Sequence, residues 1–442
     1  MLLSLMKMVS RLSIFPLTAE VSERGHLIIG GCDTVELAAE YGTPLYLFDE
    51  HSLRNKCQEF KAEFSQRYAD TTVIYASKAF LNGALAVIFK EEGLGLDVVS
   101  AGELAIAESV AFPMDMVYLH GNNKSAEEIG LALKHHVGRI VVDSLDELNM
   151  LAEMAEETGH IPDILLRLTP GVEPHTHEHI ATGVIGSKFG FPLFSADEAV
   201  VQAMSAPSLN LVGLHFHIGS LISDVRPYQE AVEIVLDFTN EMKQKHGFEL
   251  EEINIGGGFA VQYTMDYPVP PISLYAEAIV SKIISRCRKL DLPLPMITVE
   301  PGRAIVAQAG VALYRVGVIK DIPGIKKYVF VDGGMADNIR PALYSSRYEA
   351  LVANRVLEKE AGQVTIAGKF CESGDILVRD INLPPVLNGD VIAIPTCGAY
   401  CLPLQSNYNA SLKPAIFLVR EGQSRLIPRR ETFDDLTRRD LG

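Results

Sequence analysis

TVIYAS (72–77) and MITVEPG (296–302) are the first and last of eight short apolar runs rich in β-branched residues. The runs between them are LGLDVVS (94–100), MVYLHG (116–121), RIVVDS (139–144), DILLRLTPG (163–171), LVGLHFHIG (211–219) and INIGGG (253–258). Amphipathic segments such as 101–111 and 144–159 separate them. Apolar runs that alternate with helices are typical of parallel strands covered on both faces. Eight such units predict an α/β fold of the TIM-type (β/α)8 barrel class, with an open doubly wound sheet as the alternative.

The chain changes character after the last of these runs. Strand signals now follow one another closely, in VALYRVGVIK, KYVFVDG, QVTIAG, DVIAIPT and AIFLV, with Gly, Pro, Asn and Asp between them. This pattern predicts a mainly antiparallel β domain, to which the early segment 18–43 is expected to contribute. We therefore predict a barrel over 44–302, a β-sandwich or β-barrel-like domain from 18–43 and 303–442, and a poorly ordered extension over 1–17.

Composition limits the classes of protein to which the chain can belong. The 442 residues carry a net charge of −17 and 48% are hydrophobic, which is ample for two or three domains with buried cores. An acidic surface repels phosphate backbones, so we expect no nucleic-acid partner. No run of about 18 uncharged apolar residues occurs, so we expect no membrane span. Six scattered cysteines without a CxxC pair are typical of reduced thiols and favour a cytoplasmic protein.

Polar residues and glycines gather where the predicted strands end, which is where barrels of this class carry their active sites. Lys78 follows the first strand and Glu300 the last, and we expect them to face each other across the barrel mouth. A lone lysine at such a position is often a solvated loop residue. A lysine desolvated at a barrel mouth is instead less basic and forms Schiff bases with carbonyl groups. The other polar residues on or after the strands are Asp97, Arg167, His215, His217 and Arg303.

Two glycine turns follow the seventh and eighth strands, and loops at these positions commonly build a phosphate site. They are Gly256-Gly257-Gly258 and the turn at Gly302. Backbone N–H groups without a neighbouring Cβ approach a phosphate closely, and Ser220 offers a hydroxyl donor beside them. Glu300 either forms a salt bridge with Arg303 or lies against a pyridine nitrogen. In the second case it keeps that nitrogen protonated and the ring electron-accepting.

Histidines near the rim admit both structural and chemical interpretations. His217 alternates with His215 on one strand, so the two point the same way, and it is either a core residue or a ring that stacks on a cofactor. The segment HTHEH at 175–179 has the spacing of metal ligands, but no second carboxylate-rich cluster accompanies it. We therefore interpret it as a mobile polar loop and predict no metal.

Motifs along nearly the whole chain, in order, resemble the fold-type III, alanine-racemase-like pyridoxal-phosphate decarboxylases, and within them the diaminopimelate decarboxylases. They are GTPLYLFDE (42–50), YASKAF (75–80), GLDVVSAGEL (95–104), HTHEHIATG (175–183), SKFGF (187–191), LHFHIGS (214–220), IGGGF (255–259), EPGR (300–303), DGGMADNIRPALY (332–344), CESGD (371–375) and GAYCLPLQSNYN (398–409). Leu221 after HIGS and the LPLQ of GAYCLPLQ depart from the commoner family pattern. These departures concern fine specificity.

The resemblance implies a cofactor, pyridoxal 5'-phosphate, and roles for the residues that match the family's motifs. Lys78 would bear the cofactor, His217 would stack on its ring, Glu300 would contact its pyridine nitrogen and Asp97 would support the ring. The phosphate region would be held by Ser220, Gly256, Gly257, Gly258, Gly302, Arg303 and Tyr400. Substrate would be bound by Arg303, Arg340, Tyr344, Glu372 and Tyr400. Cys371 would be the proton donor and, with Glu372, would come from the neighbouring subunit of a homodimer.

The implied reaction is decarboxylation of meso-2,6-diaminopimelate to L-lysine, the last step of lysine biosynthesis. This substrate has a carboxylate at its distal end, whereas ornithine, lysine and arginine have none. Arg340 is the candidate for that carboxylate, because its planar fork suits two oxygens, unless it is a surface residue. Glu372 would pair with the distal amine. The alternatives are a decarboxylase of D- or L-ornithine, lysine, arginine or carboxynorspermidine, a racemase, and an inactive paralogue that binds partners.

Overall fold

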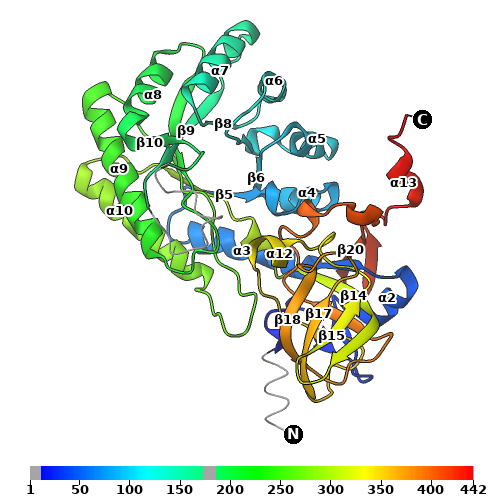
Figure 1. The fold of residues 1–442 in the computed structure, drawn as a ribbon. Coiled ribbons are helices and arrows are strands. Elements are labelled where there is room, and N and C mark those ends of the chain that lie inside the picture. The colour runs from blue at the N-terminus through cyan, green and yellow to red at the C-terminus, as the bar shows by residue number, and fades with distance from the viewer. Residues whose placement is uncertain (1–10, 173–185, 442) are drawn as a thin grey trace. The chain divides into compact units, whose positions relative to one another are not determined.

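The computed structural model describes residues 11–172 and 186–441, and these form two compact units (Figure 1). Unit 1 takes the described residues up to Asn55, Val261–Pro268, and Ile305 onward; unit 2 takes Lys56–Ala260 and Val269–Ala304, apart from the gap. HTHEH (175–179) lies outside the described residues, as does 1–10 of the predicted N-terminal extension. Residues 11–17 of that extension are described, and Ile14 and Phe15 among them are buried in the core of unit 1.

Unit 2 is a closed parallel barrel, which confirms the predicted barrel class. Its sheet runs in the order β10-β9-β11-β12-β13-β5-β6-β7-β8, and β8 also pairs with β9, so the ring closes. The ring strands are β5 (Thr71–Ala76), β6 (Gly95–Val98), β7 (Val117–Leu119), β8 (Arg139–Val142), β9 (Asp163–Thr169), β11 (Asn210–Phe216), β12 (Glu252–Asn254) and β13 (Met296–Val299). All eight predicted strands are therefore found. The short β10 (Phe191–Pro192), which was not predicted, extends the sheet beside β9.

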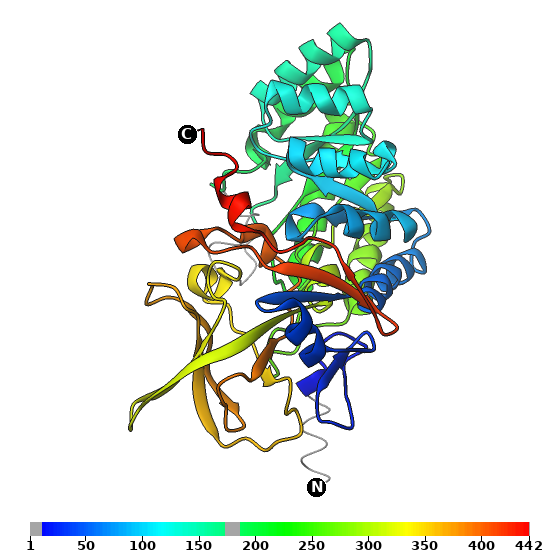
Figure 2. The same cartoon turned by 90° about the vertical axis from the view of Figure 1, so that its right-hand side faces the viewer.

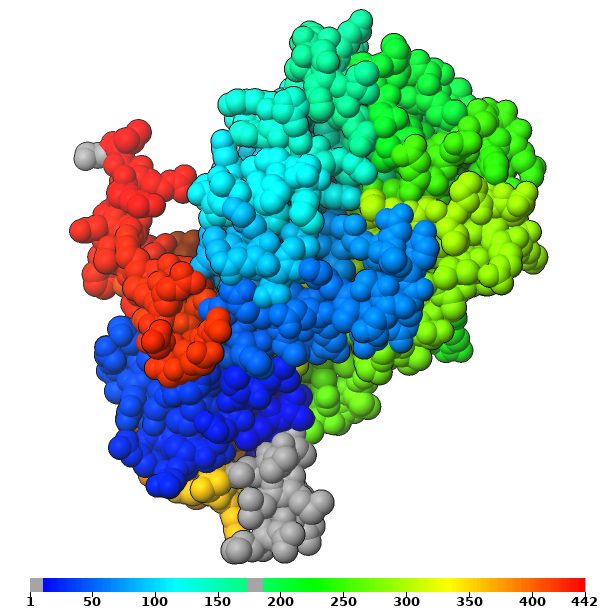
Figure 3. Space-filling model, turned by 180° about the vertical axis from the view of Figure 1, so that it is seen from behind, coloured from blue at the N-terminus to red at the C-terminus, as the bar shows by residue number. Residues whose placement is uncertain are grey.

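Helices follow the strands and lie outside the ring (Figure 1). They are α4 (Gly83–Glu91), α5 (Ala101–Ser109), α6 (Ala126–His135), α7 (Leu145–Thr158), α8 (Leu193–Ser205), α9 (Arg226–His246) and α10 (Ile272–Leu290). Ser100, Ser125 and Ser144 cap three of them by accepting a backbone N–H. In Figure 3 the blue and yellow-green segments at the two ends of this unit lie side by side. Their contact includes an ion pair between Arg67 and Glu277, with 3.0 Å between Nε and Oε2.

The barrel interior is apolar in its middle and polar at both ends. Side chains from five strands form the middle cluster, namely Ile74, Tyr118, Val141, Leu165 and Val212. Where the strands begin, the buried carboxylate of Glu252 accepts hydrogen bonds from Tyr118 Oη (3.0 Å), Thr298 Oγ1 (2.7 Å) and Arg139 Nε (2.8 Å). A buried carboxylate is tolerated when it is paired and hydrogen-bonded. This network therefore fills the end of the barrel at which the strands begin.

Unit 1 is mainly antiparallel, as predicted. A small sheet joins β1 (Glu20–Val21), β2 (Leu27–Ile29) and β3 (Cys32–Asp33). A nine-stranded sheet joins β4 (Leu45–Asp49), β14 (Gly310–Ile322), β15 (Lys326–Val331), β16 (Leu351–Val352), β17 (Gly362–Ala367), β18 (Ile376–Leu383), β19 (Val391–Ile394), β20 (Ala415–Arg420) and β21 (Gln423–Leu426). Figure 2 shows β14 as the long yellow-green strand of this unit. The helices α2 (Thr34–Tyr41), α12 (Arg340–Tyr344) and α13 (Phe433–Thr437) also belong to it.

Three elements lie near the points where the chain passes from one unit to the other. Strand β4 pairs with β14 and β20 of unit 1, although the predicted barrel limits of 44–302 include it. Helices α3 (Glu50–Ser65) and α11 (Arg303–Val306) each carry the chain from one unit into the other. The domain limits drawn from the sequence remain a prediction. No helix in the described part of the chain combines the length and the apolar character that a membrane crossing needs.

Candidate active site

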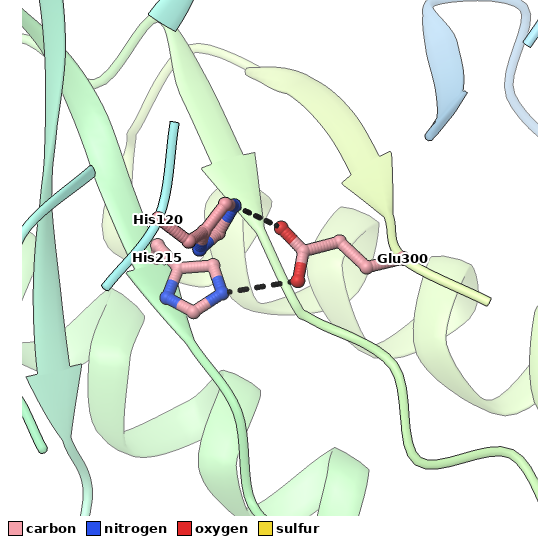
Figure 4. A group of neighbouring side chains, drawn as sticks. All are labelled: His120, His215 and Glu300. Carbon is pink, nitrogen blue, oxygen red and sulfur yellow. Dashed lines mark hydrogen bonds and ion pairs between the residues drawn. The ribbon is translucent and has the colours of Figure 1, made fainter. Parts of the chain in front are cut away.

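Glu300, directly after β13, is contacted by side-chain nitrogens from residues on or after three other strands, where the barrel strands end (Figure 4). His120 follows β7, and its Nε2 lies 3.0 Å from Glu300 Oε1. His215, on β11, places its Nε2 3.4 Å from Glu300 Oε2. Asn254, the last residue of β12, donates from Nδ2 to Oε1 over 2.7 Å. The carboxylate is therefore contacted at both oxygens, and Glu300 is only 4% exposed.

These neighbours decide the charge of Glu300. Burial alone would raise the pKa of this carboxyl group, but His120 and His215 hold the pKa well below its ordinary value. Burial lowers the pKa of His215 to about 4, so this imidazole stays neutral and acts as a donor without a charge. Glu300 is consequently a carboxylate throughout the neutral pH range.

Lys78 lies in the short 3-10 turn η1 (Ser77–Ala79) that follows β5. Its Nζ contacts Asp97 Oδ2 on β6 at 3.4 Å, and its side chain is 43% exposed whereas that of Asp97 is 1% exposed. The lysine is thus anchored at its tip to a buried carboxylate while it stays accessible. Asp97 Oδ1 also lies 3.8 Å from His120 Nε2, which connects Lys78 with the group around Glu300.

Lys78 and Glu300 do not lie on opposite sides of the barrel, so the expectation that they face each other across its mouth is wrong. Strand β13 pairs directly with β5, with Val299 opposite Val73. The first and last strands of a closed barrel are necessarily neighbours, which the sequence expectation did not take into account. The two residues therefore follow adjacent strands.

The glycine loop after β12 packs too closely for side chains. A Cβ on Gly257 would lie 2.2 Å from the backbone oxygen of Glu300, and Gly256 has a φ of 68°. The N–H of Gly256 donates to Asn254 Oδ1 (3.0 Å), and that of Gly257 donates to His217 Nδ1 (3.1 Å). Two of the three predicted phosphate donors in this loop are therefore engaged within the chain, where they fix Asn254 and His217.

The side-chain donors beside this loop also come together. Arg303 Nη2 donates to Ser220 Oγ over 3.2 Å, so the serine hydroxyl hydrogen is left to donate elsewhere. Gly302 is buried, and a Cβ there would lie 2.9 Å from that of Ala76. The imidazole of His217 loses basicity through burial first and then through the charge of Lys78, so its pKa lies well below the ordinary value. The structure thus brings Lys78, Asp97, His217, Ser220, Glu300, Gly302 and Arg303 together in unit 2.

The remaining predicted site residues belong to unit 1. Arg340, at the start of α12, is 2% exposed, so it is not a surface residue. Its guanidinium donates from Nη1 to Tyr348 Oη and lies over the ring of Tyr263, 4.7 Å from the centroid. Its Nε has no hydrogen-bond partner among the described residues, and no carboxylate pairs with the group there. A buried guanidinium in this condition is suited to an incoming carboxylate.

Four further predicted residues of unit 1 are less buried. Tyr344, at the end of α12, and Tyr400, with a φ of 61°, are half-buried. Cys371 is exposed, and so is Glu372, whose Oε1 accepts a hydrogen bond from Tyr408 Oη. The contacts within unit 1 therefore leave Cys371 and Glu372 open to solvent.

His120 and Asn254 are site residues that the sequence analysis missed. Both stand at the end of a predicted strand, in MVYLHG and INIGGG, so their position was the available signal. With His215 and Glu300, His120 forms a group whose ligand atoms lie within 4.8 Å of one another, close enough for a metal ion. The nitrogens of both histidines face carboxylate oxygens at hydrogen-bonding distances. The absence of a metal remains a prediction.

The family model for the pyridoxal binding domain of pyridoxal-dependent decarboxylases matches residues 50–307. Diaminopimelate decarboxylase of Bacillus subtilis is 44% identical over 96% of this chain and 97% of its own. The chain belongs to the diaminopimelate decarboxylase family. The enzyme of this family from Halalkalibacterium halodurans is 42% identical, again over 96% and 97% of the two chains.

Solved structures agree with this family assignment. Diaminopimelate decarboxylase from M. jannaschii in co-complex with L-lysine superposes with a TM-score of 0.90 at 35% identity, over 96% of this chain and 98% of that one. The predicted membership of the pyridoxal-phosphate decarboxylases and of the diaminopimelate decarboxylases within them is thereby confirmed.

The residues at the barrel rim fit a pyridoxal cofactor. Glu300 is a buried carboxylate with Oε2 facing only one donor, at 3.4 Å, in the described contacts. A protonated pyridine nitrogen needs such an acceptor. Lys78 offers an accessible amine, and the Ser220–Arg303 pair offers donors for a phosphate. Acceptor, amine and donors are the three chemical requirements of the cofactor, and all three occur in unit 2.

Gly257→Ala is expected to weaken cofactor binding, because the new methyl group would displace the backbone of Glu300. Overpacking of this kind costs about 1–3 kcal/mol, which corresponds to roughly 5- to 150-fold in affinity. Titration of the apoprotein with pyridoxal 5'-phosphate measures the dissociation constant. Gly83→Ala is the control, since its Cβ would meet Val110 Cγ1 at an ordinary 3.4 Å. Equal affinity in both variants would contradict the role of the loop.

Proposed function

We propose that this chain decarboxylates meso-2,6-diaminopimelate to L-lysine, the last step of lysine biosynthesis, with pyridoxal 5'-phosphate as cofactor. The observation that carries the proposal is the rim group of Lys78, Asp97 and Glu300 in a chain of this decarboxylase family. L-lysine, the product of the proposed reaction, is bound in the M. jannaschii relative. The proposed enzyme is a carbon–carbon lyase.

Each rim residue has a defined task in this proposal. When bound, the cofactor supplies an electron sink for the charge left at Cα as carbon dioxide departs. Lys78 provides the amine that anchors the cofactor, and Asp97 positions that amine. Glu300 holds a proton at the pyridine nitrogen, which His120, His215 and Asn254 allow by keeping the group ionised. The ring of His217, fixed by the hydrogen bond from the Gly257 N–H, would stack on the cofactor ring.

The phosphate group of the cofactor is assigned to residues that follow β11, β12 and β13. Ser220 and Arg303 supply side-chain donors, and the turn at Gly302 admits close approach of the backbone. In the glycine loop, the N–H groups of Gly256 and Gly257 already donate within the chain, so we assign the N–H of Gly258 to the phosphate. Tyr400 completes the phosphate region by family resemblance.

Substrate choice is assigned to unit 1. Meso-diaminopimelate differs from ornithine, lysine and arginine by its distal carboxylate, so a cation at the distal end distinguishes it. Arg340 is a buried guanidinium with an unpartnered Nε in the described contacts, which suits that carboxylate. Arg303, Tyr344 and Tyr400 would bind the rest of the substrate, and Glu372 its distal amine.

Cys371 is proposed as the proton donor to Cα, acting in a homodimer. The thiol is exposed in the single chain, as is Glu372. A group that delivers a proton to a carbanion needs a site from which water is excluded. A second copy that covers this segment meets that need, so we assign Cys371 and Glu372 to the partner's active site. The described residues form no disulfide, which fits the reducing cytoplasm as the compartment.

Lys78→Ala is expected to abolish turnover, because the site loses the amine that anchors the cofactor. Two measurements check this: the visible absorbance of the purified protein with added pyridoxal 5'-phosphate, and carbon dioxide release from meso-diaminopimelate. Lys134→Ala, which changes an exposed lysine near the end of α6, should behave as the unchanged chain does. Full activity in Lys78→Ala would exclude the proposed chemistry.

Arg340→Ala is expected to reduce kcat/KM for meso-diaminopimelate. Loss of one partner of a buried, hydrogen-bonded charge pair costs about 2 kcal/mol or more, roughly 30-fold. Carbon dioxide release from a panel of diaminopimelate, lysine, D- and L-ornithine, arginine and carboxynorspermidine tests the choice. Arg347→Ala removes an exposed arginine of the same unit and serves as control. If another panel member is the preferred substrate of the unchanged chain, the assignment of meso-diaminopimelate is wrong.

A shared active site makes two inactive chains complement each other. Lys78→Ala and Cys371→Ala should each be inactive alone, since each lacks one required group in every site. Random dimers of the two should recover about one quarter of the unchanged activity, because half of the dimers are mixed and each has one intact site. Co-expression with two different affinity tags isolates the mixed dimers. If these dimers are inactive, Cys371 does not act across the interface.

A further inference from the structure

The contacts of Glu300 are unequal at its two oxygens, and His120 makes the difference. Oε1 accepts a hydrogen bond from Asn254 Nδ2 at 2.7 Å and also lies 3.0 Å from His120 Nε2, a contact that is not aligned as a hydrogen bond. Oε2 faces only His215 Nε2, at 3.4 Å, in the described contacts. An ionised carboxylate has about four acceptor positions, and Oε2, with one contact at 3.4 Å, has more room for a further donor than Oε1, which has two nitrogens within 3.0 Å. Figure 4 shows the two histidines approaching different oxygens.

We propose that His120 is a positioning residue for the decarboxylation: its Nε2 lies against Glu300 Oε1 and holds the carboxylate in place, and so leaves Oε2 to the cofactor's ring nitrogen. This inference rests on the proposed function, since it needs a cofactor with its ring nitrogen at Glu300. His120 acts through Glu300 and is not itself in the reaction.

The position of His120 supports this role. The residue comes directly after β7, and its backbone N–H donates to Val98 O over 2.8 Å, which continues the parallel ladder. The imidazole is 4% exposed, and its ring meets that of His215 edge to face, with 5.0 Å between centroids. A buried ring wedged in this way has little rotamer freedom, so its nitrogen is held at a fixed point.

The two histidines are not equivalent. His215 stays neutral because burial lowers its pKa to about 4, and its contact with Glu300 is the longer of the two. His120 makes the shorter contact, with 3.0 Å between its Nε2 and Glu300 Oε1. The charge interaction with His120 is the largest cause that lowers the pKa of Glu300 against the effect of burial. Removal of His120 would therefore raise the pKa of Glu300.

The pH dependence of this site involves several other charged groups that surround Glu300 and His120. On the strands and the loops that follow them these are Lys78 after β5, Asp97 on β6, Arg167 on β9, and His215 and His217 on and after β11. Helix α5 contributes Glu103, whose pKa burial raises to about 7. Glu103 is itself expected to titrate near neutral pH. A useful variant must therefore change the pKa of Glu300 without replacing any of these charged groups.

Three variants of His120 meet this condition. His120→Leu removes the donor. His120→Gln places an amide N–H near the position of the imidazole Nε2, and His120→Asn has the same amide on a shorter side chain that does not reach Glu300. Gln and Asn are equally polar, so a difference between them reports the contact and not the burial of a polar group.

Two readouts separate positioning from a structural role. The first is the dissociation constant of pyridoxal 5'-phosphate for each apoprotein as a function of pH. The folded-state pKa of Glu300 is depressed, so its charge is present above that pKa and is lost below it. A raised pKa therefore shifts the acid limit of tight binding upward. The second readout is kcat and KM measured separately with meso-diaminopimelate.

We expect His120→Leu and His120→Asn to lower kcat about 10-fold and to change KM less than about 2-fold. Losses of this size are typical when a residue that orients a functional group is removed. Their acid limit of cofactor binding should move to higher pH. His120→Gln should restore both quantities to near those of the unchanged chain. His135→Leu removes another histidine–carboxylate contact of unit 2, at 3.7 Å from Glu108, and should change neither.

Glu300→Gln separates failure of this inference from failure of the proposed function. If Glu300→Gln leaves cofactor binding and kcat unchanged, Glu300 does not serve the cofactor, and both the proposed role of Glu300 and this inference are overturned. If Glu300→Gln impairs them but His120→Leu and His120→Asn behave as the unchanged chain, only this inference is overturned. Equal losses of kcat and cofactor binding in His120→Gln and His120→Asn, with equally lowered thermal midpoints, would also overturn this inference. Such a result would indicate that His120 serves only in packing.

Discussion

The backbone pairing of β13 with β5 is the contact on which the site depends, because it closes the ring between the last and first strands of the barrel. Closure makes all strands end at one rim, and polar residues far apart in the sequence meet there. It also makes the strands that precede Lys78 and Glu300 adjacent, so the lysine and the carboxylate of the site follow neighbouring strands. An open sheet would separate these two strands by its full width.

The rim works because its charges are arranged in a short chain of contacts. The Lys78 amine touches Asp97, Asp97 approaches His120, and His120 approaches Glu300. Each carboxylate lies next to a cation or a nitrogen donor, so neither is an uncompensated buried charge. The same contacts connect the accessible amine of Lys78 with the buried carboxylate of Glu300. The site is therefore one connected network and its members are expected to respond together to substitution.

The sequence predicted the barrel well because periodicity and strand length report burial directly, and all eight runs became ring strands. It also placed Lys78, Asp97 and Glu300 at strand ends, and the structure brings these residues together at one rim. It missed His120 and Asn254, because which of several polar residues at a rim reaches Glu300 depends on side-chain distances that spacing does not contain. The placement of β4 was a different case: an apolar run does not reveal which of two sheets it will join.

Two of the buried carboxylates of the barrel, one at each end, differ in one respect. Glu252, where the strands begin, ion-pairs with Arg139 at 2.8 Å and accepts two hydroxyl groups besides. Glu300, at the opposite rim, has neutral nitrogen donors and an oxygen with spare capacity. The carboxylate at one end of the barrel is thus fully paired within the chain, whereas the carboxylate at the other end can accept a further hydrogen bond. Selection for a new amino-acid substrate could remodel the second end while the first preserves the fold.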